Sequence, residues 1–185
     1  MAEFYETTPT LNNYWRSIVL FGRNVASYKF ALAKSLLNFR DRGNDLIRLD
    51  ELARPFSRNL CEHLAHSPKQ ATSSSSKFLD SCQEFNAGTL AQTELDTITT
   101  RLGFNNVIDA FHVVNQEAIP ELFFIDERIE SRGIRLTDNL FKLLGDKHAG
   151  SLTPEVEARW RLVETAWDLN ISRNLIENFN IFLCI

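Results

Sequence analysis

Hydrophobic positions recur at helical spacing along most of the chain, and the stretch from Asn24 to Phe39 shows this most clearly. At about 100° per residue, its apolar side chains share one broad face. Asn24 can cap a helix start, because its side-chain oxygen accepts the free N–H groups of a first turn. Lys29 is the residue that interrupts the apolar arc. The pattern predicts a central helix over 24–39 that contacts several neighbours.

A first helix is predicted from Leu11 to Phe21, capped by Asn12 or Asn13 and ended by Gly22. It would form a helical hairpin with the central helix.

Further helices follow from the same spacing. Residues 49–66 predict a helix with a break at Pro55, because proline lacks an N–H and disfavours a helical residue before it. A serine-rich loop is expected over 67–76. The remaining helices are expected over 77–86, 90–102, 107–114 and 137–144.

The last predicted helix opens at Thr153-Pro154 and buries one face made of Val156, Trp160, Val163 and Trp167. Its other side is expected to be solvated and carries Glu155, Glu157, Arg159, Arg161 and Glu164. Short apolar runs at 122–125 and 134–136 predict a β-hairpin. The expected fold is therefore mainly α, a compact multi-helix domain with one small β-hairpin near 122–136.

Length and net charge limit the classes of function that this chain can have. A chain of 185 residues makes one domain, or one domain plus a fragment, and its net charge of −4 argues against a protein that coats nucleic acid non-specifically. The charge is uneven, since residues 1–48 carry +3 and the remainder −7. A local basic face near the N-terminus is therefore possible.

Cysteine usage and hydropathy point to a cytoplasmic protein. Cys61, Cys82 and Cys184 are odd in number and lack C-x-x-C spacing, so no disulfide framework is expected. No signal peptide is recognisable, and no run of about 18 apolar residues predicts a membrane span. We expect no membrane partner.

No catalytic motif is recognisable, so no catalytic residue and no cofactor are predicted. Cys61, His63 and His66 are close in sequence, but a tetrahedral zinc site needs four ligands and nothing nearby completes the set. Ordinary helix residues are the favoured interpretation, and no metal is expected. His112 is interpreted as a core or partly exposed helical histidine rather than a general base.

Lys29 allows three interpretations. Its stem could pack in the core while its amine reaches water, it could pair with a carboxylate, or it could bind a phosphate beside the start of the central helix. The first is favoured. For the third, the candidate residues for binding DNA phosphates are Arg16, Arg23, Asn24, Ser27, Lys29 and Lys34.

Five segments carry a family resemblance: TLNNYWRSIVLFGRNVASYKFALAKSLL (10–37), LARPFSRNLCEHL (52–64), SKFLDSCQEFNAG (76–88), GFNNVIDAFHVVN (103–115) and PEVEARWRLVETAWDLNISRNLI (154–176). Together they resemble the N-terminal helical region of bacterial HNH-family endonucleases of the restriction or phage-defence kind. In that family the nuclease module lies C-terminal to this region. No histidine follows position 176 here, so the resemblance carries no catalytic residue over.

The resemblance implies a helical accessory domain over 1–176 and an apolar tail over 177–185, expected to be a truncated continuation. It implies DNA engagement or assembly as the function. The alternative is a protein-interaction domain that binds a partner subunit, or itself, without nucleic acid, which the acidic part from residue 49 onward favours. A metal-free enzyme of unknown type ranks last, because no acid–base pair or nucleophile stands out in the sequence.

Overall fold

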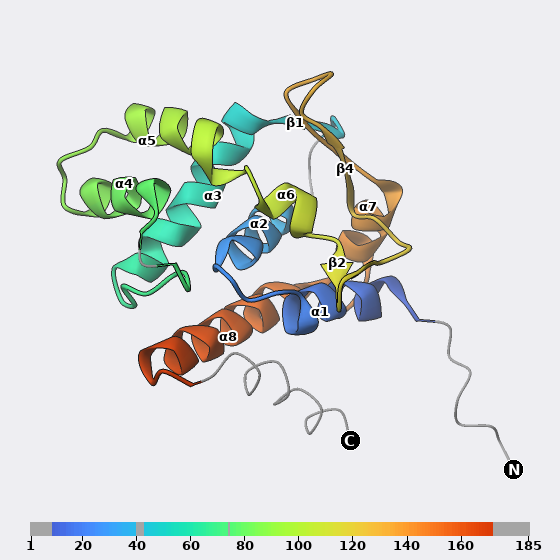
Figure 1. The fold of residues 1–185 in the computed structure, drawn as a ribbon. Coiled ribbons are helices and arrows are strands. Elements are labelled where there is room, and N and C mark those ends of the chain that lie inside the picture. Colours follow the sequence, from blue (N-terminus) through green and yellow to red (C-terminus); the bar gives the residue numbers. More distant parts are fainter. Residues whose placement is uncertain (1–8, 40–42, 74, 172–185) are drawn as a thin grey trace, which may run out of the picture.

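The computed structural model describes residues 9–39, 43–73 and 75–171, which form a mainly helical domain with two small antiparallel sheets (Figure 1). The predicted fold class is confirmed. The predicted boundary between 1–176 and 177–185 lies outside the described residues.

Helix α1 spans Leu11–Phe21, as predicted, but its cap differs. Thr10 is the N-cap residue, and its side chain accepts the N–H of Asn13. The Thr10 N–H in turn donates to the side-chain oxygen of Asn13, which completes a capping box. Capping by Asn12 or Asn13 is therefore wrong, because Asn13 is the third helical residue.

Helix α2 spans Tyr28–Leu37 and starts later than predicted. The Ser27 N–H donates to the carbonyl oxygen of Gln70 over 2.9 Å, and the Thr72 N–H donates to that of Val25 over 2.8 Å. Residues 22–27 are thereby held beside 70–72 as an irregular linker, and Asn24 caps no helix. The central position is confirmed, because α2 is buried between two other helices (Figure 1).

The first of these neighbours is α3, which spans Leu49–Leu64 without a break. The predicted break at Pro55 is wrong. Proline removes one backbone hydrogen bond, whereas Leu52, Phe56 and Leu60 are fully buried and fix the helix in the core on both sides of it.

Helix α4 (Lys77–Asn86) is found where predicted, with Ser76 as its N-cap. The region predicted as a helix over 90–102 is α5 (Gln92–Ile98) followed by a π-helical turn, η1 (Thr99–Gly103).

The predicted helix over 107–114 is wrong in its second half. Helix α6 covers only Val107–Ala110, and strand β2 (Val113–Val114) then pairs with β3 (Glu117–Ala118). The two-residue loop between them, Asn115 and Gln116, has φ of 51° and 71°, as a type I′ hairpin requires.

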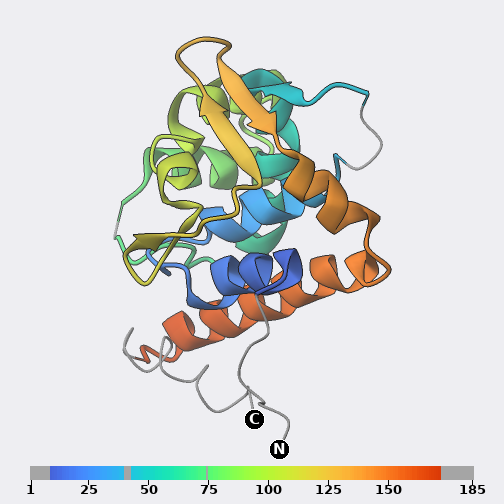
Figure 2. The same cartoon turned by 90° about the vertical axis from the view of Figure 1, so that its right-hand side faces the viewer.

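The predicted hairpin is confirmed as β4 (Phe124–Glu127) and β5 (Gly133–Leu136), and it projects from one end of the molecule (Figure 2). The unpredicted strand β1 (Leu46–Arg48) adds to β5, giving the order β1-β5-β4. A Cβ atom at Gly133 would clash with the carbonyl oxygen of Ile47, so this pairing requires a glycine.

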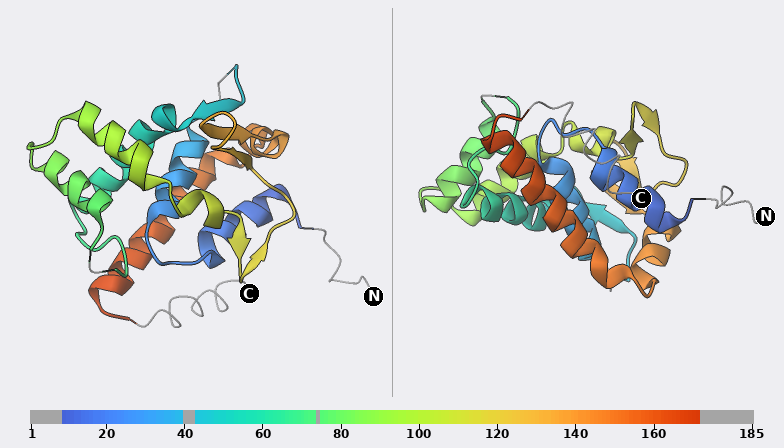
Figure 3. Two further views of the ribbon diagram at one scale, coloured as in Figure 1. Left: turned by 45° about the horizontal axis from the view of Figure 1, so that its top comes forward. Right: turned by 90° about the horizontal axis from the view of Figure 1, so that it is seen from below.

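Helix α7 (Asp138–Gly145) leads into α8 (Ala149–Asp168), which begins before the predicted Thr153. Seen from below, α8 runs across α2 and beside α1 (Figure 3). The predicted apolar face of α8 is buried. Its opposite side is not wholly solvated, since Arg159 and Glu164 are only 4% and 7% exposed.

Candidate functional site

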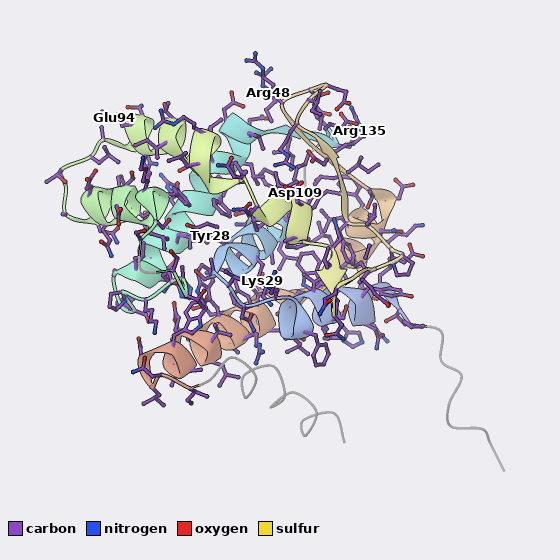
Figure 4. The ribbon with its side chains drawn as sticks, in the orientation of Figure 1. Tyr28, Lys29, Arg48, Glu94, Asp109 and Arg135 are labelled. Atoms are coloured by element: carbon purple, nitrogen blue, oxygen red, sulfur yellow. The ribbon has the colours of Figure 1, made fainter. Side chains whose placement is uncertain are left out.

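Lys29 binds the carboxyl end of α1 (Figure 4). Its Nζ donates to the carbonyl oxygen of Gly22 and, over 3.3 Å, to that of Ile18, and the residue is 7% exposed. A cation is favourable there, because the last carbonyl groups of a helix carry partial negative charge. The prediction that the Lys29 amine reaches water is therefore wrong.

Arg16 and Lys34 are both paired with α8. Arg16 donates two hydrogen bonds to Glu155, of 2.7 and 2.9 Å, and Lys34 Nζ lies 2.9 Å from Glu157 Oε2. The bond from Arg16 holds the pKa of Glu155 below its usual value. Burial alone would raise the pKa of Glu157, but hydrogen bonds from Lys34 and Arg161 lower it to about 2. The basic charge of α1 and α2 is thus partly neutralised within the fold.

The three other residues predicted to bind DNA phosphates lie partly in the core and partly on the surface. Asn24 and Ser27 are 1% and 0% exposed, and the Ser27 hydroxyl donates to the Gln70 carbonyl oxygen. Arg23 is exposed. The six candidate residues therefore do not form one accessible basic face.

A polar cavity of about 450 Å³ opens between α3 and α8 instead. It is lined by Glu62, His63, His66, Ser67, Glu157, Arg161, Glu164, Thr165 and Asp168. His63 is one of these lining residues and is 5% exposed. Its ring stacks on Trp160 with centroids 3.5 Å apart.

Two carboxylates hold the His63 ring. Nδ1 lies 2.7 Å from Glu164 Oε1, and Nε2 lies 3.2 Å from Glu157 Oε2. The two carboxylates contact different ring nitrogens, so together they fix the orientation of the imidazole ring.

Gln70 completes this network. Its side-chain N–H group donates to Glu164 Oε1 over 2.5 Å, and its side-chain oxygen accepts the indole N–H of Trp160 over 2.9 Å. Every hydrogen-bonding partner of Glu164 named here is thus a buried polar group. The network joins α3, the segment around Gln70 and α8, and its geometry is that of a structural support.

An apolar groove of about 270 Å³ lies between α1 and α8. It is lined by Trp15, Arg16, Val19, Leu20, Glu155, Ala158, Arg159 and Leu162. Leu162 is 46% exposed, which is high for a leucine beside a groove. The indole N–H of Trp15 is buried and finds no acceptor within the described ranges. Among the described residues, this groove is an accessible apolar feature of a size that can receive a ligand side chain.

His112 is a core histidine, as expected. It is 8% exposed, and its Nε2 accepts the backbone N–H of Phe123 over 3.0 Å, which requires a neutral ring. Burial lowers its pKa to about 4.

Sequence reasoning missed both the His63 network and the groove. Glu157 and Glu164 are seven residues apart and share one face of α8, which is a signal that the two could act together. Nothing in the local sequence says that His63 and Gln70 meet that face.

Comparison with known proteins finds no matching family model, curated protein or solved structure. The resemblance to HNH endonucleases stays a prediction. No helix among the described residues is long and apolar enough to span a membrane. Within 9–39, 43–73 and 75–171, no group of three or more His, Cys, Asp or Glu side chains is placed to hold a metal ion.

Proposed function

We propose that this chain is an assembly domain whose groove between α1 and α8 holds a short apolar segment of a protein partner. The observation that carries the proposal is the groove itself, with an apolar floor and the exposed Leu162 at its edge. Exposed apolar grooves of folded domains are typical docking sites for amphipathic segments.

The charges at the groove favour an uncharged ligand surface. Arg16 and Glu155 lie on opposite walls and are already joined by two hydrogen bonds. An apolar segment that covers them breaks no ion pair and removes the Leu162 side chain from water. Full burial of an exposed leucine contributes about 1.5–3 kcal/mol. Leu162 is 46% exposed, so covering it contributes part of that amount and the rest of the binding energy comes from the other groove contacts.

Binding of DNA is the alternative that the predicted basic residues suggested. Arg16 and Lys34 would have to exchange carboxylates of α8 for phosphates, and Lys29 would have to leave the end of α1. These exchanges lower the net gain from each phosphate contact. The geometry therefore favours a protein partner.

The test places a photo-crosslinking amino acid at Leu162 or, as a control, at Ile129, which is 93% exposed on the distant hairpin. We expect a crosslinked protein only from position 162, and a stable complex when that protein is purified and mixed with the wild-type chain. Equal crosslinking from both positions, or no complex between the purified proteins, would contradict the proposal.

A DNA titration tests the alternative. Fluorescence anisotropy of a labelled duplex should show no binding at low salt. Binding that weakens steeply with salt and depends on Arg23 would instead support contact with phosphates.

A further inference from the structure

Two buried cysteines meet where α3 packs against α4. Cys61 lies in the last turn of α3 and Cys82 lies in α4, and both are free thiols. The Cys61 thiol donates to the carbonyl oxygen of Cys82, with Sγ and O 3.8 Å apart. The side-chain N–H group of Asn86 donates to the Cys61 carbonyl oxygen over 2.8 Å. Two hydrogen bonds in opposite directions therefore hold α4 against Cys61.

The two thiols also interact with each other. A hydrogen bond between their side chains lowers the pKa of Cys61 and raises that of Cys82, because the Cys82 S–H donates to the Cys61 sulfur. Cys61 is thus the residue of the pair that ionises more readily, and the thiolate is the form that reacts with oxidants. Cys61 is also the more accessible of the two, with 5% exposure against 0% for Cys82.

We propose that Cys61 and Cys82 form a peroxide-sensitive pair, which oxidises to a disulfide that ties α3 to α4. The two residues are 21 positions apart, and the fold brings them together. Rotation of the two side chains brings the sulfurs to the bonding distance of about 2.05 Å while the helices stay packed. The proposal is independent of the groove between α1 and α8.

Hydrogen peroxide is the oxidant that the reaction requires. The Cys61 thiolate attacks one peroxide oxygen and the O–O bond breaks, which leaves a sulfenic acid on Cys61 and a hydroxide ion that takes up the proton lost by the thiol. The Cys82 sulfur then attacks the Cys61 sulfur, and the departing hydroxide takes the Cys82 proton. The pair loses two electrons and two protons, and one peroxide molecule becomes two molecules of water.

The disulfide encloses the part of the chain that joins α3 to α4, and this part holds other elements in place. Gln70 donates to Glu164 on α8, and the Thr72 N–H donates to the Val25 carbonyl oxygen in the linker before α2. Closing a loop of about 20 residues stabilises a fold mainly by restricting the unfolded chain. Oxidation should therefore raise the midpoint of thermal unfolding by about 5–10 °C.

Peptide mass spectrometry of the full chain tests the pair directly. Trypsin cleaves after Lys69 and Lys77, between the two cysteines, so their disulfide appears as one linked peptide under non-reducing conditions. After treatment with a few equivalents of hydrogen peroxide, we expect this linked peptide in most chains of the wild type and of the control Cys184→Ser. Dithiothreitol should remove it and reverse the rise in the unfolding midpoint. In Cys82→Ala we expect no such rise, and dimedone should trap the sulfenic acid on Cys61.

Absence of the linked peptide from the peroxide-treated wild type would overturn the inference, whether or not Cys82→Ala folds. A linked peptide that joins two chains would also overturn it, and a mixture of isotope-labelled and unlabelled chains reveals such a link by mass. A midpoint that rises equally in Cys82→Ala would assign the stabilisation to another oxidation and contradict the role of the disulfide.

Discussion

Glu164 accepts a hydrogen bond from His63 over 2.7 Å, although the two residues lie 101 positions apart on α8 and α3. On the same helix, Ala158 and Leu162 line the groove beside α1. The polar network and the apolar groove therefore lie on different sides of α8.

Removing Glu164 should therefore destabilise the domain. Glu164→Ala leaves His63 and Gln70 without their shared acceptor, and each buried polar group left without its partner costs about 1–3 kcal/mol. Urea unfolding measures the loss. Glu62→Ala, at an exposed position beside the same cavity, is the control and should change stability by less than about 0.5 kcal/mol. Similar losses in both variants would mean that the network contributes nothing specific.

His112 should make the fold sensitive to acid. Its pKa is lowered to about 4 from an ordinary 6.5, so the unfolded chain binds the proton more readily between these values. The stability it contributes is complete above pH 6.5 and is lost as the pH falls through this window. The loss between about pH 7.5 and about pH 5 is roughly 2 kcal/mol.

The matched variants are His112→Gln and His148→Gln, the second at an exposed site. Unfolding at both pH values should show a smaller acid loss in His112→Gln alone. An unchanged acid loss in that variant would assign the effect to other groups.

Lys29 should matter for stability. Lys29→Met keeps the stem but withdraws the donor from the Ile18 and Gly22 carbonyl groups, at a cost of about 1–3 kcal/mol. Thermal unfolding compares it with Lys147→Met, an exposed lysine that should be neutral. A Lys29→Met protein with the same thermal unfolding midpoint as the wild type would show that the amine is dispensable at the end of α1.

The loop of the β2–β3 hairpin offers a stabilising substitution. Gln116 has a φ of 71°, which costs a side-chain-bearing residue energy that glycine avoids. Gln116→Gly should raise stability by about 0.5–1 kcal/mol, measured as a higher midpoint of thermal unfolding. The same change at Glu130, in the other hairpin, should give no such gain.

Long amphipathic segments could be predicted from the sequence, and short or long-range features could not. The apolar spacing of 11–21, 77–86 and 137–144 locates α1, α4 and α7 almost to the residue. Strands of two or three residues, such as β1 and β2, are too short to show a period of two.

Errors at the candidate site have the same origin. Asn24 has the chemistry of a cap, but pairing of the linker with 70–72 delays the helix to Tyr28. Glu164 has the chemistry of a solvated residue, but His63 and Gln70 bury it from distant parts of the chain. The residue pattern along one helix cannot reveal a contacting residue that tertiary packing brings in from a distant part of the chain.

The affinity of the partner recovered by crosslinking tests the central claim most directly, measured by calorimetry with wild type, Leu162→Asp and Ile129→Asp. The account predicts that Leu162→Asp weakens binding at least tenfold, which is about 1.4 kcal/mol, while Ile129→Asp leaves it unchanged. Equal affinity for all three proteins would contradict the groove between α1 and α8 as the docking site.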